Sequence, residues 1–314
     1  MPSLLEVKGL TVRFRTQYGQ VHALTDAHFD LDYGETLVLV GESGSGKTVL
    51  AHALMRLLPM NAEVEGTVRL AGEDLLKLDE GKMCAYRGQR MSLIPQSPGA
   101  SLNPVRQLGA LLMEAARARG LNPEEARSRL TTLLSEVGLS YQEIKKQYVH
   151  QLSGGMQQRV VNALALVGEP DLVIADEPTY GLDSDLVDVT ASQLAAIAQR
   201  GAALIVITHD LRLAERLGGR LALIYASYIV ELRPTKKFFA VPIHPYGRAL
   251  LDALPERGGR PIPGLSPELT ALPEHCPFAF RCEHSLPRCM ESMPQAANVA
   301  ACRSTVRCFL HAES

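Results

Sequence analysis

The sequence lacks an excess of charge of either sign. Its 314 residues include 32 Lys and Arg against 34 Asp and Glu, which gives a formal net charge of −2. Proteins that bind nucleic acid non-specifically usually carry a basic surface, so this balance argues against a nucleic-acid partner. Hydrophobic residues make up 46% of the chain, which is enough for a substantial folded core.

Long apolar runs are also missing. None approaches the roughly 18 to 20 residues that a membrane-crossing helix needs, and the first residues lack the basic and then apolar segment of a signal peptide. Only one of the six cysteines precedes residue 276. We expect a protein that stays in the cytoplasm, where clustered cysteines more often form a metal or redox site than disulfides.

Short buried-strand patterns alternate with helical patterns along most of the chain. Continuous apolar runs, typical of strands buried on both faces, occur at residues 36–40, 172–175 and 203–207. Helical patterns follow, for example at residues 47–58 and 186–198. The alternation predicts an α/β fold with a parallel sheet. Alternating apolar residues near the start predict an antiparallel β subdomain, with strands at 4–14 and 21–31.

Two segments depart from this alternation. Residues 105–152 are helical in character and have no buried-strand pattern, which predicts an inserted helical subdomain. From residue 254 the composition shifts to Pro, Gly, Cys and Arg. We therefore expect a main domain over residues 1–253 and a Cys-rich, loop-rich extension over residues 254–314.

Residues 41–48, with the sequence GESGSGKT, match the phosphate-loop pattern GxxxxGK[ST]. The match lies between a predicted buried strand and a predicted helix, as phosphate binding requires. Backbone N–H groups of such a loop point at phosphates, Lys47 reaches the β and γ oxygens, and the Thr48 hydroxyl binds Mg²⁺. The predicted nucleotide-binding residues are Gly41, Glu42, Ser43, Gly44, Ser45, Gly46, Lys47 and Thr48.

Two carboxylates, Asp176 and Glu177, follow the apolar run 172–175. Such a pair often caps a helix, but downstream of a phosphate loop we expect Asp176 to hold hydrated Mg²⁺ and Glu177 to act as general base on water. Gln96 and His209 also follow apolar segments. Taken alone, Gln96 is more often a loop contact and His209 a structural histidine.

Residues 152–156, with the sequence LSGGM, lie between the phosphate loop and the acidic pair. Ser153 is expected to cap a helix whose free N–H groups face an anion. In this order the motifs resemble the ATP-binding subunits of ABC transporters, which carry the signature LSGGQ, and the resemblance covers residues 1–250. It implies a P-loop ABC cassette in which two subunits enclose two ATP molecules. The residues implied to contact the partner's ATP are Leu152, Ser153, Gly154, Gly155 and Met156.

The resemblance also implies roles for single residues. Gln96 would bind Mg²⁺ beside Thr48 and Asp176 and would touch the transmembrane partner, while His209 would contact the γ-phosphate. The implied catalytic set is thus Glu177, His209 and Gln96. Tyr18 would stack on adenine, with Phe14 as a competitor, and residues 181–183 would cross the subunit interface.

A narrower resemblance, to the peptide and nickel importer group, extends over nearly the whole chain. It depends on SLNP at 101–104, HPY at 244–246, IPG at 262–264, CPF at 276–278 and Arg281-Cys282. Four thiolates can hold zinc or an iron–sulfur cluster, and spacing alone does not choose. The resemblance implies a [4Fe–4S] cluster, with Cys302 able to replace the last of the four ligands, Cys276, Cys282, Cys289 and Cys308.

The family resemblance implies an ATPase that couples ATP binding and hydrolysis to import of peptides or a related solute. Its implied partners are two transmembrane permease subunits, a second ATP-binding subunit, identical or related, and indirectly an extracytoplasmic solute-binding protein. The implied location is peripheral, at the cytoplasmic face of the inner membrane. Nickel or metal-chelate cargo stays open. A soluble ABC ATPase acting on nucleic acid or the ribosome is the rival, disfavoured by the single cassette and the absence of heptads.

The chain departs from the group's usual pattern at four places. Pro95, Val149 and Tyr180 replace an aromatic residue, a proline and a threonine, and the usual Asp-Gly turn near Ser227 is absent. None of these changes removes a group that hydrolysis needs.

Overall fold

The computed structural model describes residues 3–17, 19–180, 184–299 and 303–311. The chain forms two compact units. Unit 1 contains residues 1–31, 36–76 and 208–314, and unit 2 contains residues 32–35 and 77–207. The predicted boundary at residue 253 falls within unit 1.

An antiparallel sheet occupies the first part of unit 1. Its strand order is β2-β1-β4-β5, formed by β1 (Leu5–Thr16), β2 (Gly19–Leu31), β4 (Ala62–Leu70) and β5 (Glu73–Asp74). β1 and β2 pair from Leu5 opposite Leu31 to Thr16 opposite Gly19. Apolar side chains at alternate positions of β1, such as Leu5 and Val7, are buried, as the period of a half-buried strand requires. The predicted antiparallel strands are thus present.

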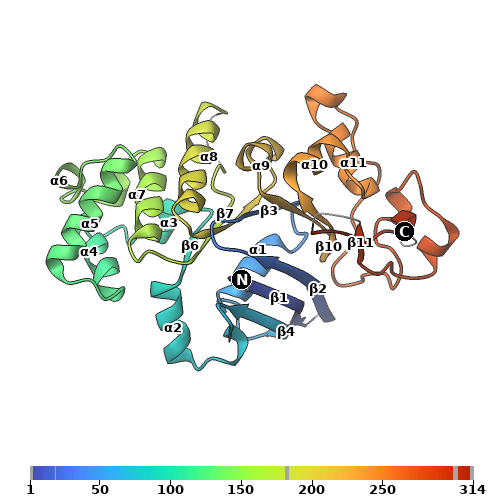
Figure 1. Cartoon of the computed structure of the whole chain (residues 1–314), viewed down its shortest axis with the longest axis horizontal. Helices are drawn as coiled ribbons and strands as arrows, with labels where there is room; N and C mark the ends of the chain where they lie inside the picture. The colour runs from blue at the N-terminus through green and yellow to red at the C-terminus, as the bar shows by residue number, and fades with distance from the viewer. Residues whose placement is uncertain (1–2, 18, 181–183, 300–302, 312–314) are drawn as a thin grey trace. The chain divides into compact units, whose positions relative to one another are not determined.

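A second set of strands in unit 1 carries the phosphate loop. In the order β11-β12-β10-β9-β3, it comprises β3 (Thr36–Gly41), β9 (Arg220–Tyr225), β10 (Tyr228–Pro234), β11 (Ala297–Val299) and β12 (Ser304–Val306). β3 runs parallel to β9, and all six β3 residues are buried, as its apolar run predicts. β12 pairs with β10, so the extension contributes strands to this sheet (Figure 1).

The helices of unit 1 are short. They are α1 (Lys47–Leu54), α9 (Leu211–Leu217), α10 (Thr235–Ala240) and α11 (Pro245–Asp252), with 3-10 turns η3 (Pro255–Arg257), η4 (Ala279–Arg281), η5 (Pro287–Met290) and η6 (Phe309–His311). α1 ends before the predicted residue 58. Arg56 has a positive φ of 50°, a conformation that an α-helix of L-residues does not continue.

Unit 2 combines parallel strands with a group of helices. The strand order β8-β7-β6 is formed by β6 (Met91–Ile94), β7 (Leu172–Asp176) and β8 (Ala203–Thr208), with parallel pairing throughout. The α-helices are α2 (Glu80–Gln89), α3 (Pro98–Ser101), α4 (Leu108–Ala118), α5 (Pro123–Glu136), α6 (Tyr141–Ile144), α7 (Gly154–Leu166) and α8 (Ser184–Gln199). The 3-10 turn η1 (Leu75–Lys77) leads into unit 2, and η2 (Val149–Gln151) precedes α7.

Residues 105–152 contain α4, α5, α6 and η2 and no strand among those residues, which agrees with the predicted helical segment (Figure 1). α5 begins at a capping box, in which the Asn122 side chain accepts hydrogen bonds from Glu124 and Glu125 N–H groups and the Glu125 carboxylate accepts one from Asn122 N–H. In the described ranges no helix combines the length and the hydropathy that a membrane crossing demands.

Candidate nucleotide-binding site

The phosphate loop connects β3 to α1 in unit 1, with the strand–loop–helix order that the sequence predicts. The Lys47 ammonium folds back over the loop and donates hydrogen bonds to the carbonyl oxygens of Gly41, at 2.8 Å, and Glu42, at 2.9 Å. Lys47 is buried, with 7% of its surface exposed. The lysine therefore lies along the loop whose phosphate ligand it is predicted to hold.

Two glycines allow the loop to pack against neighbouring backbone. Gly46 has a φ of 109°, and a Cβ atom there would lie 2.1 Å from the Ala23 carbonyl oxygen in β2. A Cβ atom on Gly41 would lie 2.1 Å from the Ile224 carbonyl oxygen in β9. Both separations are far below contact distance, so only glycine fits at either place.

The β9–β10 hairpin supports the loop from one side. Ala226 and Ser227 at its turn have positive φ values of 45° and 70°. This is the sign that a type I′ turn requires at both central residues, so the hairpin forms without the Asp-Gly pair. Ser227 N–H donates to the Ser45 carbonyl oxygen at 3.2 Å, and its own carbonyl accepts from Thr25 N–H at 2.8 Å.

One polar atom in the loop is buried without a partner. The Ser45 hydroxyl, within the described residues, has no hydrogen-bond partner. Buried polar atoms are nearly always satisfied, and an exception at a ligand loop is a place for a ligand atom. The loop glycines, the Lys47 ammonium and this hydroxyl fit the phosphate chain of ATP.

The acidic pair lies at the carboxyl end of β7 in unit 2. β7 pairs with β6 so that Ala175 lies opposite Ile94, and Gln96 follows two residues later on an exposed bend. Asp176 is 4% exposed. The strands thus bring Gln96, Asp176 and Glu177 to one edge of this sheet, as their sequence positions predict.

Glu177 has a strained backbone. Its φ is 46°, and its N–H donates to the Ile207 carbonyl oxygen at 2.8 Å. The left-handed conformation costs a non-glycine residue about 1 to 2 kcal/mol. Strain of this kind concentrates at functional sites, where the surrounding structure maintains it. The predicted role of Glu177 as general base stays a prediction, and its backbone is one of several with positive φ.

The LSGGM segment precedes α7 in unit 2. The Ser153 hydroxyl accepts a hydrogen bond from Met156 N–H at 3.3 Å, so Ser153 is the helix cap that the sequence predicts. Ser153 and Gly154 are exposed, and Cβ atoms on Gly154 or Gly155 would meet nothing within 4 Å. The helix terminus therefore has an open side on which a ligand can lie.

The remaining predicted residues lie in other parts of the chain. His209 directly follows β8 and is exposed, and the next residue, Asp210, caps α9. Tyr18, residues 181–183 and Cys302 lie outside the described residues. Phe14, the alternative to Tyr18, pairs with Val21 in the β1–β2 ladder.

The four remaining extension cysteines are all free thiols. Burial raises the pKa of Cys276 and of Cys308 to about 11, and the other cysteines add a smaller repulsive effect. Burial also raises the pKa of Cys282, again with a contribution from Cys289. No group of three or more His, Cys, Asp or Glu side chains is arranged to hold a metal ion in the described part of the chain. The cysteines lie near enough to one another to raise one another's pKa, and the predicted cluster on them stays a prediction.

Sequence reasoning missed two residues that contact the phosphate loop. The Tyr246 hydroxyl accepts a hydrogen bond from Glu42 N–H at 3.0 Å, and the Arg281 guanidinium forms an ion pair with the Glu42 carboxylate. Both residues lie in segments noted only for their resemblance to the importer group. The signal was present in HPY at 244–246 and in Arg281-Cys282, but nothing in the sequence connects either segment to residue 42.

Comparison with known proteins identifies the class of this protein. A family model described as "ABC transporter" matches residues 24–180, and one described as "Oligopeptide/dipeptide transporter, C-terminal region" matches residues 230–289. The chain belongs to the ABC transporter family and is one of the ATP-binding subunits of that family. Its curated relatives include proteins of oligopeptide and dipeptide transport.

Two of these relatives match nearly the full chain. The oligopeptide transport ATP-binding protein OppD of Haemophilus influenzae is 39% identical over 299 residues, with 92% of each chain covered. The dipeptide transport ATP-binding protein DppD of Bacillus subtilis is 38% identical over 320 residues, with 99% of this chain and 95% of that protein covered.

Solved structures confirm the cassette fold. A dimeric ATP-binding cassette in a post-hydrolysis state, bound to ADP and Pi, has a TM-score of 0.65 at 24% identity and covers 74% of this chain and 98% of that one. An ATP-binding subunit of an ABC transporter has a TM-score of 0.63 at 28% identity, with 76% and 92% covered.

Proposed function

We propose that this chain is the ATP-hydrolysing subunit of a peptide importer. The observation that carries the proposal is the identity of 38 to 39% to oligopeptide and dipeptide transport ATP-binding proteins over at least 92% of the chain. The phosphate loop, the LSGGM segment and the Asp176-Glu177 pair supply the chemistry of ATP hydrolysis. Peptide is the cargo that these relatives' names favour over nickel or a metal chelate.

We assign the site residues to three tasks: binding the phosphates of ATP, binding Mg²⁺ and activating the attacking water. Residues 41–48 hold the phosphates of ATP, with the Lys47 ammonium on the β and γ oxygens. Thr48, Gln96 and Asp176 supply the hydroxyl, amide and carboxylate oxygens that Mg²⁺ prefers. Glu177 accepts a proton from the attacking water, and His209 contacts the γ-phosphate. Tyr18 stacks on the adenine ring.

The exposed Ser153 and Gly154 at the start of α7 support an arrangement in which ATP is enclosed between two subunits. Leu152, Ser153, Gly154, Gly155 and Met156 contact the phosphates of the ATP held by a second ATP-binding subunit, related or identical. Free N–H groups at the α7 terminus suit this anion. A single subunit should therefore hydrolyse ATP poorly.

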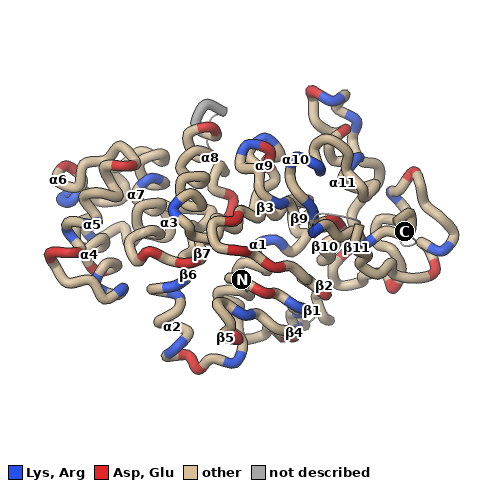
Figure 2. Tube along the Cα trace, in the orientation of Figure 1, with Lys and Arg blue, Asp and Glu red and all other residues tan. Residues whose placement is uncertain are grey.

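Transport requires partners that this chain does not contain. We propose two transmembrane permease subunits, docked near Gln96, and a solute-binding protein outside the membrane, with this chain at the cytoplasmic face. Residues 1–253 would form the ATPase domain and residues 254–314 an appended extension. Basic and acidic residues are interspersed along the trace in both units, which does not favour the nucleic-acid alternative (Figure 2).

We further propose a [4Fe–4S] cluster on Cys276, Cys282, Cys289 and Cys308. Three of these residues are buried and one is half-buried. When bound, a cluster takes one thiolate per iron and cross-links the segments that carry them. The expected role of the cluster is structural.

The test of the ATPase assignment is Glu177→Gln, measured as phosphate release and as retained ATP. Loss of a general base lowers turnover by about 10² to 10⁴-fold, while ATP stays bound and the closed dimer accumulates. The matched control is Glu73→Gln, which removes the charge of an exposed carboxylate on β5. This variant should keep wild-type turnover.

Two outcomes would contradict parts of the proposal. Wild-type hydrolysis by the Glu177→Gln variant would reject its role as base. Equal ATP binding by wild type and Lys47→Ala would reject the nucleotide site itself.

Purification from native membranes tests the importer role. Two multi-span membrane proteins should copurify with the chain. Recovery of ribosomes or DNA-repair proteins instead would support the soluble alternative.

A further inference from the structure

An arginine of the extension forms a two-pronged ion pair with the phosphate loop. The Arg281 Nη1 atom lies 3.1 Å from Glu42 Oε2, and Nη2 lies 3.0 Å from Oε1. This fork geometry is the strongest form of an arginine–carboxylate contact. Arg281 is only 8% exposed, and Ser266 of the extension also hydrogen-bonds to the Glu42 carboxylate. The carboxylate of the loop is therefore held by the extension.

The guanidinium is itself held in place. Its Nε atom donates to the Pro263 carbonyl oxygen at 2.8 Å, and Nη1 donates to the Tyr225 hydroxyl at 3.1 Å. Its carbon lies 5.6 Å from the Tyr225 ring centroid and 5.9 Å from that of Phe278. A cation at these distances is attracted to the ring faces. Arg281 thus has a preset orientation.

An aromatic cluster beside Arg281 joins three segments of unit 1. The ring centroids of Tyr225 in β9 and Tyr246 in α11 are 4.6 Å apart, and Phe278 of the extension lies 5.2 Å from the first and 5.4 Å from the second. Tyr246 also accepts the hydrogen bond from Glu42 N–H. Both the backbone and the side chain of Glu42 are therefore fixed by residues that follow position 224.

The negative charge of Glu42 would repel the phosphates of ATP. Its carboxylate belongs to the loop that must accept a triphosphate of several negative charges. Like charges repel strongly where solvent screening is reduced, and the Glu42 side chain is only 29% exposed. Arg281 supplies the opposite charge at hydrogen-bond distance. This contact places a positive charge beside the carboxylate and holds the carboxylate toward the extension.

We propose that Arg281 is a positioning residue for ATP: by binding and neutralising Glu42, it makes the Cys-rich extension a working part of the nucleotide site. The inference rests on the proposed nucleotide site at residues 41–48. It assigns the extension a function in ATP affinity besides any cluster that it holds.

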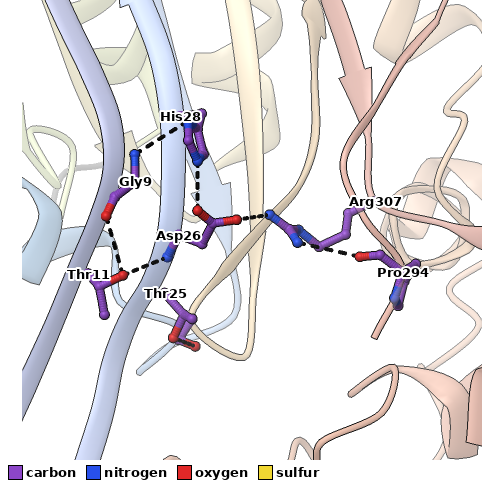
Figure 3. A network of polar contacts seen from close by, with 8 residues as sticks. Gly9, Thr11, Thr25, Asp26, His28, Pro294 and Arg307 are labelled. Carbon is purple, nitrogen blue, oxygen red and sulfur yellow. Dashed lines mark hydrogen bonds and ion pairs between the residues drawn. The ribbon is translucent and has the colours of Figure 1, made fainter. Parts of the chain in front are cut away.

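A second arginine of the extension serves as the natural control. Arg307 Nη2 lies 2.8 Å from the Asp26 carboxylate in β2, and Nη1 donates to the Pro294 carbonyl oxygen (Figure 3). Like Arg281, it directly precedes a cysteine and is buried, with 5% of its surface exposed. It also connects the extension to the first strands, but its side chain contacts Asp26, Pro294 and the ring of Tyr228 rather than the phosphate loop.

The experiment measures the ATP dissociation constant and the turnover at saturating ATP for a small set of variants. Arg281→Ala should raise the ATP dissociation constant about tenfold or more, because Glu42 is left uncompensated. Arg281→Ala with Glu42→Gln should return it to within about threefold of wild type, since the repelling charge is gone. Turnover at saturating ATP should change much less than affinity in both variants, and Arg307→Ala should leave ATP affinity within about twofold.

The rescue separates a charge effect from loss of structure. If Arg281→Ala fails to fold, judged by circular dichroism, Arg281→Gln with and without Glu42→Gln makes the same comparison with an uncharged side chain of similar length. ATP affinity unchanged by Arg281→Ala, or no rescue by Glu42→Gln, would overturn the inference. An equal loss of affinity in Arg307→Ala would also overturn it. Absence of ATP binding in wild type would instead reject the proposed nucleotide site, which Lys47→Ala tests independently.

Discussion

Protonation of His244 should destabilise the folded protein as the pH falls below neutrality. His244 caps α11, and its Nδ1 atom accepts a hydrogen bond from Tyr246 N–H at 3.0 Å, which requires that nitrogen to carry no proton. The residue is 2% exposed. Burial lowers its pKa to about 3, and the nearby His311 adds a smaller repulsion. The folded state therefore excludes a proton that the unfolded chain accepts near pH 6.5.

The size of the effect follows from proton linkage. Above pH 6.5 neither state binds the proton, and the stabilisation is fully present. Between pH 6.5 and 3 the unfolded state binds more protons than the folded state, so the free energy of unfolding falls as the pH falls. At pH 5 the loss is about 2 kcal/mol, since each pKa unit corresponds to about 1.4 kcal/mol and pH 5 lies about 1.5 units below the unfolded pKa. This value depends little on the folded pKa as long as that pKa stays below 5.

Urea unfolding of wild type and His244→Asn at pH 7 and pH 5 measures this loss. Asn caps helices through a side-chain oxygen that does not titrate in this range, so the variant should lose about 2 kcal/mol less than wild type on acidification. His150→Asn, at an exposed position, should behave like wild type. Equal losses in wild type and His244→Asn would refute the reasoning.

Two further predictions concern the loop and the extension. Gly46→Ala should abolish measurable ATP binding in equilibrium titrations, because its methyl group would lie 2.1 Å from the Ala23 carbonyl oxygen and the loop must move; wild-type affinity in this variant would contradict the packing. Anaerobically purified protein should contain about four iron and four sulfide per chain, and Cys276→Ser should lower both. Stoichiometric zinc without iron would exclude the cluster.

The sequence predicts the central strands well, and the reason is physical. β3 and β8 are buried along their whole length, so each appears as an uninterrupted apolar run that needs no knowledge of its neighbours. The end of α1 could not be predicted in the same way. Arg56 is a good helix former, and its left-handed backbone reflects packing of the chain rather than a local preference.

The strands of the extension could not be predicted from sequence patterns. β11 and β12 have three residues each, too few to show an alternation of apolar and polar positions. They form because β10 offers a partner, with Glu231 opposite Val306. Such a pairing depends on the tertiary fold.

In the candidate site, too, the local features could be predicted from the sequence and the long-range contacts could not. Motif spacing predicts the loop of residues 41–48, the Ser153 cap and the acidic pair, because each is a local arrangement of backbone and side chain. The pairing of Glu42 with Arg281 joins positions 239 residues apart, and no periodicity relates them. Only the fold shows that the extension reaches the phosphate loop.

The strands β11 and β12 of the extension also cover a sheet edge that could otherwise pair with another chain. β12 covers the side of β10 away from β9, where Arg307 N–H donates to the Val230 carbonyl oxygen at 2.9 Å. A sheet edge with free N–H and C=O groups is a template for pairing with another chain. In this sheet the outermost strand at that side is β11, whose three residues offer little to pair with. A chain shortened to its cassette would expose β10 instead, and aggregation would compete with its folding.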